Sequence, residues 1–247
     1  YLSGLSWSFA TRLSGKVDRS FRIDVGDESN ENLYSKDREF SFASLKEAVE
    51  MTVDAVSASG MKLDEYAYDS YALDYETMQR EEVFAEKAGD VISDKHSEWS
   101  EADDCYMLYL MQEHNKIPVY FGTSDFLGTE DTNRPVQVIV SQAGIEYLMV
   151  QDLFQFADEK ERYQLTAFET VTECVAHKYG DVLTGAEYQV TGAELFLVPV
   201  KKHEKGYEMH LAWLFTVHET GTDSEFGDYD NILYTIVDAE TGEELTI

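Results

Sequence analysis

Four acidic residues near the C-terminal end of the chain have side chains of the kind that bind calcium. They lie close together between two predicted strands, at Asp223, Glu225, Asp228 and Asp230. Calcium prefers hard oxygen ligands, so Asp223, Asp228 and Asp230 are candidate ligands in a calcium-stabilised surface protein. The spacing is not that of an EF-hand loop, and the alternative interpretation is a solvated acidic loop.

Tyrosine is concentrated in the first half of the chain. The tyrosines that we take as candidate binding residues are Tyr66, Tyr68, Tyr71, Tyr75 and Tyr109. A tyrosine side chain combines a large contact area with a polar tip, and it is favoured where proteins bind partners or sugars. The alternative is packing within strands, because tyrosine also has a high preference for β-structure.

Motifs for nucleophilic or metal catalysis are incomplete in this sequence. The stretch 122–126 lacks the final glycine of a nucleophile elbow, and Ser59-Gly-Met-Lys62 lacks the motifs that accompany Ser-x-x-Lys in β-lactamases. His210 and His218 share a predicted strand face but lie too far apart along it to ligate one ion directly. The sequence contains no His-Glu-x-x-His, Cys-x-x-Cys or phosphate-binding glycine loop. We therefore predict no catalytic residue, no metal and no cofactor.

The many carboxylates of the chain allow one enzymatic alternative, a hydrolase that uses acid–base chemistry. Among 49 acidic residues, some pair will always lie at a separation suited to acid–base chemistry. The chain also lacks the alternating strand–helix pattern that builds a large sugar-binding cleft. The main prediction is a non-enzymatic extracytoplasmic binding or regulatory module, and a carboxylate-based hydrolase acting at the cell surface is the alternative.

The net charge of −30 restricts the class of partner. Such a surface repels phosphate backbones, so nucleic-acid binding is excluded, whereas cationic partners are attracted.

No run of about 18 apolar residues is present, so no transmembrane segment is predicted. The chain starts at Tyr1, and we expect that a targeting segment has been removed. Cys105 and Cys174 are placed in different predicted units, which favours two buried free thiols, with a disulfide left open.

Two amphipathic helices are predicted, each starting at a capping box. Ser44-Leu-Lys-Glu47 precedes apolar residues at helical spacing as far as Val56, and Gly60 ends this helix. Thr166-Ala-Phe-Glu169 resembles the same motif, and its helix continues to Gly180.

The remaining regular structure is predicted to be strands. They are expected at 21–25, 66–75, 105–112, 117–121, 136–141, 145–156, 187–190, 193–201, 207–218, 231–237 and a short edge strand at 243–247. In the strand 207–218, Leu211, Trp213, Phe215 and Val217 alternate with more polar residues, with Leu214 as the exception, which predicts one buried and one wetter face.

The order of these elements suggests a duplication. Residues 36–42 resemble 160–165, and residues 136–144 resemble 232–242. The predicted fold class is α+β, with two tandem units that each pack one main helix on a curled antiparallel sheet. The predicted domains are a lead-in at 1–20, a first α+β unit at 21–156 with an acidic insertion at about 79–103, and a second α+β unit at 157–247.

The second half also resembles a known family. Its helix is followed by Ala193–Val200, by Leu211-Ala-Trp213-Leu-Phe215 and by Ile236-Val-Asp-Ala-Glu-Thr-Gly242. This pattern is similar to uncharacterised secreted lipoproteins of gram-positive gut bacteria and, more distantly, to PepSY-type domains and extracellular regulators of a cell-wall-sensing histidine kinase. The resemblance implies an extracytoplasmic or secreted location, an N-terminal lipid anchor outside residues 1–247, and an unknown protein or cell-wall ligand as partner. It carries over no active-site residue.

Overall fold

The computed structural model describes residues 7–10, 34–88, 98–121, 135–150, 153–156, 162–182, 185–202, 206–223 and 227–246. The chain forms two compact units. The N-terminal unit comprises Leu2–Glu113 and Phe121–Gln155, and the C-terminal unit comprises His114–Tyr120 and Phe156–Ile247. The strand predicted at 21–25 lies outside the described residues.

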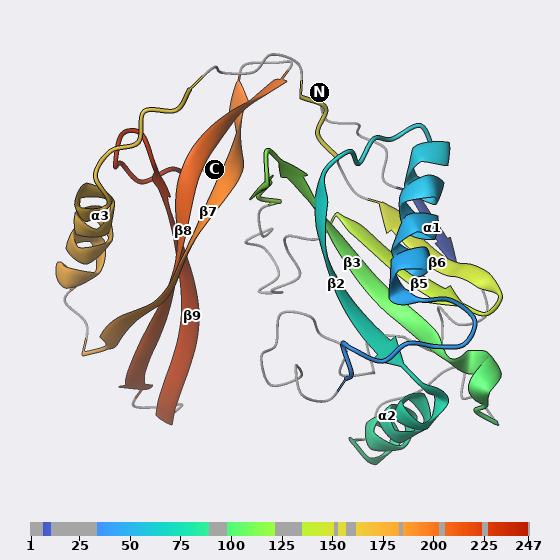
Figure 1. Cartoon of the computed structure of the whole chain (residues 1–247). Coiled ribbons are helices and arrows are strands. Elements are labelled where there is room, and N and C mark those ends of the chain that lie inside the picture. Colours follow the sequence, from blue (N-terminus) through green and yellow to red (C-terminus); the bar gives the residue numbers. More distant parts are fainter. Residues whose placement is uncertain are drawn as a thin grey trace. The chain divides into compact units, whose positions relative to one another are not determined.

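The N-terminal unit is built on an antiparallel sheet with the strand order β1-β6-β5-β3-β2 (Figure 1). Its strands are β1 (Trp7–Ala10), β2 (Tyr66–Leu73), β3 (Cys105–His114), β5 (Val136–Ser141) and β6 (Gly144–Val150). The strand β3 pairs with β2 on one side and with β5 on the other, so that Leu108 lies opposite Ser70 and Val138. The strand β1 falls within the predicted lead-in.

The helix α1 (Leu45–Ala58) covers one face of this sheet, and its capping box is confirmed. Glu47 N–H donates to the Ser44 hydroxyl at 3.3 Å, and Ser44 N–H donates to a Glu47 carboxylate oxygen at 2.8 Å. Gly60 follows the helix end with φ +87°, a conformation that glycine adopts without strain. The buried residues of α1, which include Val49 and Val56, pack against Leu108 and Val138 of the sheet.

The opposite face of the sheet is also buried. Here Leu73, Met107 and Tyr109 pack with Tyr34 and with Met78 of α2. The helix α2 (Tyr75–Ala88) follows β2 directly and overlaps the start of the predicted acidic insertion at about 79–103. A short 3-10 turn, Glu101–Asp103, leads back into β3. Because both faces are covered, β3 is apolar almost without alternation.

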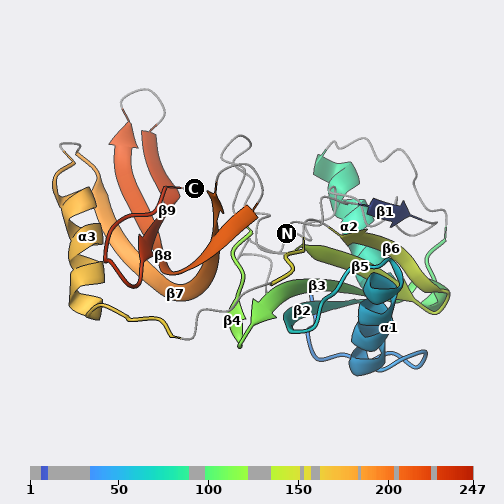
Figure 2. The ribbon, with the colours of Figure 1, turned by 90° about the horizontal axis from the view of Figure 1, so that it is seen from above.

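The C-terminal unit consists of a three-stranded antiparallel meander and one helix (Figure 2). Its elements are β4 (Ile117–Pro118), α3 (Phe168–Gly180), β7 (Glu187–Lys202), β8 (Gly206–Asp223) and β9 (Gly227–Asp238). The long strands β7 and β8 pair along almost their whole length, with one irregularity between Val190 and Gly192. The strands predicted at 187–190, 193–201, 207–218 and 231–237 are confirmed as parts of β7, β8 and β9. The predicted edge strand at 243–247 is wrong, because the described residues there form an isolated bridge between Glu244 and Val237 and no strand.

The prediction of a wetter face on β8 holds only in part, since His210, Thr216 and His218 on that face are partly exposed. Val217 and Phe215 pack against Val171 and Val175 of α3, as expected. The neighbouring residues Ala212 and Leu214 are buried as well, in a second cluster with Tyr120, Phe196, Val198 and Ile236. The backbone N–H of Tyr120 donates to the carbonyl of Leu197 at 2.9 Å. A distant stretch of chain therefore covers part of the face that alternation predicted to be wetter.

The predicted fold of two tandem helix-on-sheet copies is also wrong. The described residues are mostly antiparallel sheet, with 49% strand, 23% helix, three helices and two sheets of different size. The matched stretches are not equivalent: β5 is a central strand between β3 and β6, whereas β9 is at the end of its sheet. What remains of the predicted class is the general α+β character.

The second capping box is absent from α3. The helix begins one residue later than predicted, with Ala167 at the N-cap and no side-chain hydrogen bond there. The N–H of Thr166 instead donates to the carbonyl of Ala239 at 2.9 Å. Cys105 and Cys174 are free thiols, the first buried and the second half-buried.

Candidate functional site

A groove lies in the C-terminal unit between α3 and the sheet. Its volume is about 440 Å³, a size that suits a small ligand or a few side chains. The lining is mostly apolar and includes Val175, Ala176, Tyr179, Tyr188, Val190 and Val217. Val190 remains 50% exposed. The groove therefore leaves apolar surface in contact with water, which is typical of a binding site.

The sequence builds this groove from two simple periodicities. Residues Thr172, Val175, Ala176 and Tyr179 recur at intervals of three and four, so they form one stripe along α3. On the sheet, alternate residues of β7 and β8 point to the same face, and Val190 lies directly opposite Val217. The stripe covers the sheet only in part, because a single helix is narrower than the paired strands β7 and β8.

Two tyrosines mark the end of the groove at the C-terminus of α3. The ring centroids of Tyr179 and Tyr188 are 5.0 Å apart. The hydroxyl of Tyr179 lies 2.7 Å from that of Thr235, which ties α3 to β9. The hydroxyl of Tyr188 donates to Glu219 at 2.8 Å, and Asn231 donates to the other carboxylate oxygen at 3.3 Å. An otherwise apolar groove thus has a carboxylate at one end.

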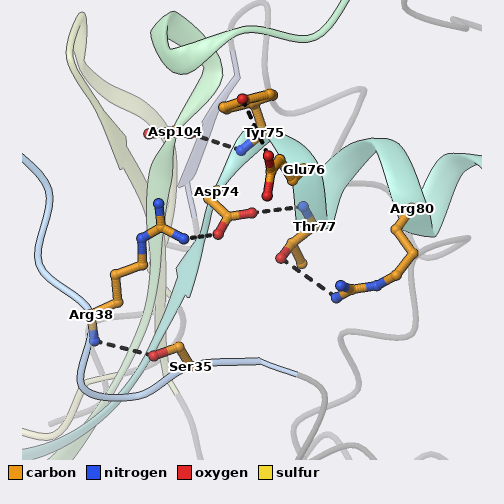
Figure 3. A network of polar contacts seen from close by, with 8 residues as sticks. All are labelled: Ser35, Arg38, Asp74, Tyr75, Glu76, Thr77, Arg80 and Asp104. Carbon is orange, nitrogen blue, oxygen red and sulfur yellow. Dashed lines mark hydrogen bonds and ion pairs between the residues drawn. The ribbon is translucent and has the colours of Figure 1, made fainter.

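A second polar site lies in the N-terminal unit at the corner between β2 and α2 (Figure 3). Asp74 caps α2 by accepting the N–H of Thr77 at 2.7 Å, and it forms an ion pair with Arg38. Asp104, at the start of β3, accepts the N–H of Tyr75 at 2.8 Å. Arg80, farther along α2, reaches the Thr77 hydroxyl at 3.5 Å.

The surroundings of Asp104 in this corner shift the pKa of its carboxyl. Burial raises the pKa of Asp104 above its ordinary value, and the charge of Asp74 acts in the same direction. The hydrogen bond from Tyr75 and the charge of Arg38 oppose this shift without cancelling it. Asp104 therefore has one property of a general acid. Its Oδ1 and that of Asp74 are already engaged by backbone N–H groups, which is the arrangement of structural caps.

A further hollow of about 420 Å³ lies beside α1 in the N-terminal unit. It is lined by Glu47, Glu50 and Asp54 of α1 and by the turn between β5 and β6. Glu47 belongs to the capping box, and its hydrogen bonds with Ser44 lower the pKa of its carboxyl. This hollow is the solvated acidic side of α1.

Four of the five predicted tyrosines are divided between the two faces of the N-terminal sheet. Tyr71 and Tyr109 are each 4% exposed and meet edge to face with ring centroids 6.4 Å apart. Tyr66 packs at the α1 side, and Tyr68, two residues later on the same face, is 44% exposed. Tyr75 begins α2. The structure brings Tyr71 and Tyr109 together but not the full set, and their role in binding stays a prediction.

The calcium candidates are engaged in contacts between β8 and β9. Asp228 accepts a hydrogen bond from Thr222 at 2.7 Å, and Asp230 lies 3.1 Å from Nδ1 of His218. Glu225 and the side chain of Asp223 lie outside the description. Among the described residues no group of three acidic, histidine or cysteine side chains could hold a metal ion.

Comparison with known proteins gives a likeness in fold. No family model and no curated protein matches the sequence. The chain is similar to the crystal structure of an uncharacterized protein from Eubacterium rectale ATCC 33656, with a TM-score of 0.58 and 16% sequence identity. The match covers 88% of this chain and 60% of that protein. At this identity the likeness concerns the fold alone.

Sequence reasoning did not single out the groove residues. Val190 was predicted as an ordinary strand position, and Glu219 lay just beyond the predicted strand 207–218. The available signal was the apolar stripe of α3 together with the alternation of β7. Neither pattern reveals how much of the sheet the helix leaves uncovered. None of the helices in the described part of the chain combines the length and apolar character needed to cross a membrane.

Proposed function

We propose that this protein is a non-enzymatic binding or regulatory module that acts outside the cytoplasm. The observation that carries the proposal is the groove between α3 and the strands β7 and β8. It has a ligand-sized volume of about 440 Å³ and retains exposed apolar lining at Val190. The free energy gained by removing such surface from water is the usual source of affinity for apolar ligands.

The groove can be tested with a neutral, environment-sensitive fluorophore such as N-phenyl-1-naphthylamine. We expect saturable fluorescence enhancement with residues 1–247. Ala176 is exposed and lines the groove, so Ala176→Phe should fill it without disturbing the core and remove most of the enhancement. Ala58→Phe, at an exposed position near the end of α1, is the matched control and should bind as the wild type does.

Two results would contradict the proposal. One is the absence of saturable binding, and the other is equal binding by Ala176→Phe and the wild type. Thermal melts of each variant show whether the protein remains folded, so that a loss of binding is not confused with unfolding.

The location outside the cytoplasm is supported by the sequence resemblance to secreted lipoproteins. In this proposal the natural protein is lipid-anchored at the cell surface, and its partner is a protein or a cell-wall component. Protease treatment of intact cells that express the natural protein tests the location. Digestion at the surface is expected, and full protection until the cells are lysed would contradict it.

A carboxylate-based hydrolase is the second candidate, because the buried carboxyl of Asp104 has a raised pKa beside Asp74. Panels of ester, peptide and glycoside substrates test it. Turnover that Asp104→Asn abolishes while the fold is preserved would replace the binding proposal. A calcium-stabilised surface protein is tested by thermal melting, since a melting temperature unchanged by calcium or a chelator removes that hypothesis.

A further inference from the structure

We propose that the groove between α3 and the strands β7 and β8 selects a cationic peptide segment. Such a segment places an apolar side chain in the groove and a lysine or arginine against Glu219. This inference rests on the proposed binding function and adds the chemical class of the ligand.

The position of Glu219 carries the argument. Glu219 lies directly opposite Tyr188 in the β7–β8 ladder and two residues beyond Val217 on the same strand. Since alternate strand residues share a face, its carboxylate is on the side of the sheet that forms the groove. The hydroxyl of Tyr188 donates to one carboxylate oxygen at 2.8 Å, which holds the charge at the end of the groove.

The C-terminus of α3 adds negative potential at the same end. Tyr179 and Gly180, which line the groove, are the last residues of this helix, and the last carbonyl groups of a helix carry a partial negative charge. Asp181 follows and is exposed. A cation that binds beside Glu219 is therefore favoured by the carboxylate and by the helix terminus together.

The nearby lysine does not neutralise this end. Lys178, the only lysine of α3, forms an ion pair with Glu244 and lies over the ring of Tyr179. Residues 156–247 contain 19 acidic and 6 basic residues, so this unit as a whole attracts cations. Charge complementarity thus favours a cationic peptide over an acidic one or a second copy of this chain.

The test compares three capped tetrapeptides that share a Leu-Leu centre and carry lysine, glutamine or glutamate at both ends. Isothermal titration measures their affinities for residues 1–247. We expect the lysine peptide to bind at least about fivefold more tightly than the glutamine peptide. This is the gain in affinity that one partly exposed charge-assisted hydrogen bond to Glu219 would give. The glutamate peptide should bind most weakly.

Two variants locate the charge effect. Glu219→Gln keeps an acceptor for Tyr188 and should abolish most of the preference for lysine. Glu194→Gln removes an exposed carboxylate from the opposite face of β7, where Glu194 pairs with Leu214, and should keep the preference. Equal affinity of the lysine and glutamine peptides, or equal losses in the two variants, would overturn the inference.

The neutral fluorophore separates this inference from the proposed function. If the fluorophore binds and Ala176→Phe blocks it, but the peptides show no charge preference, the groove is a binding site of different specificity. If neither fluorophore nor peptide binds, the proposed function fails as well.

Discussion

The Nδ1 atom of His210 on β8 lies 2.8 Å from Oδ2 of Asp238, the last residue of β9. The other carboxylate oxygen of Asp238 accepts the backbone N–H groups of Glu240 and Thr241 at 2.8 and 2.9 Å. Asp238 is 5% exposed, whereas Glu208, 3.6 Å from Nε2 of His210, is at the surface. One buried carboxylate therefore joins β8 to the turn that follows β9.

This arrangement predicts a loss of stability in acid. Burial favours the protonated form, but the hydrogen bonds from His210, Thr241 and Glu240 outweigh it and lower the pKa of Asp238. Such a group contributes stability above its unfolded pKa of about 3.9, and the contribution is lost as the pH falls through the folded pKa. Urea unfolding at several pH values should show this loss, and Asp238→Asn should reduce it. An unchanged pH slope in the variant would contradict the assignment.

For Asp104 we predict the opposite dependence of stability on pH. Because burial raises the pKa of its carboxyl, the folded state binds the proton more tightly than the unfolded state does. The contribution of Asp104 to stability therefore increases as the pH falls through its folded pKa. Asp104→Asn cannot ionise and still offers an acceptor to Tyr75. Its stability relative to wild type should improve from about pH 4 to about pH 7, and a constant difference would be evidence against the shift.

Alanine substitution at the N-terminus of α1 and at that of α3 should lower the free energy of unfolding by unequal amounts. Ser44→Ala removes the side-chain acceptor of a complete capping box and should lower the free energy of unfolding by about 1 kcal/mol. Thr166→Ala is the matched control, because the N-cap of α3 is Ala167 and no side chain caps it. Its loss should be less than half as large. Chemical denaturation measures the free energy of unfolding of both variants. Equal losses would show that the Thr166 side chain caps α3 after all.

Alanine substitution of two glycines in the C-terminal unit should change stability by different amounts. Gly242 has φ +74°, and a Cβ atom there would lie 2.9 Å from the methyl carbon of Thr170. Gly242→Ala should therefore destabilise the protein by at least about 1 kcal/mol. At Gly180 an added Cβ meets no atom within 4 Å, so Gly180→Ala at the helix end should be neutral or slightly stabilising. Thermal melts of the two variants decide between these outcomes.

Local patterns were sufficient for most of the individual elements. The capping box at Ser44, the apolar spacing through Val56 and the glycine at position 60 define α1 because each acts within a few residues of chain. The turn at Gly144 separates β5 from β6 for the same reason.

Relationships between distant residues were not predictable in this way. The capping motif at Thr166 fails because the N–H of that residue is bonded to Ala239, more than seventy residues later. Ala212 and Leu214 are buried by Tyr120 and not by a neighbour in sequence. The likeness between 136–144 and 232–242 reflects shared strand-and-turn chemistry, which does not specify whether a strand is central or at an edge.

The sequence by itself determined most of the described strands, the helix α1, the acidic composition and the absence of the common catalytic motifs, because these depend on residue type and short-range spacing. Only the tertiary structure decided which faces are buried, how the two units differ, and that Tyr188 and Val190 line one groove with α3 while Tyr188 holds Glu219 at its end. The physical reason is that burial and charge proximity depend on which distant surfaces meet, and periodicity along a chain does not encode that choice.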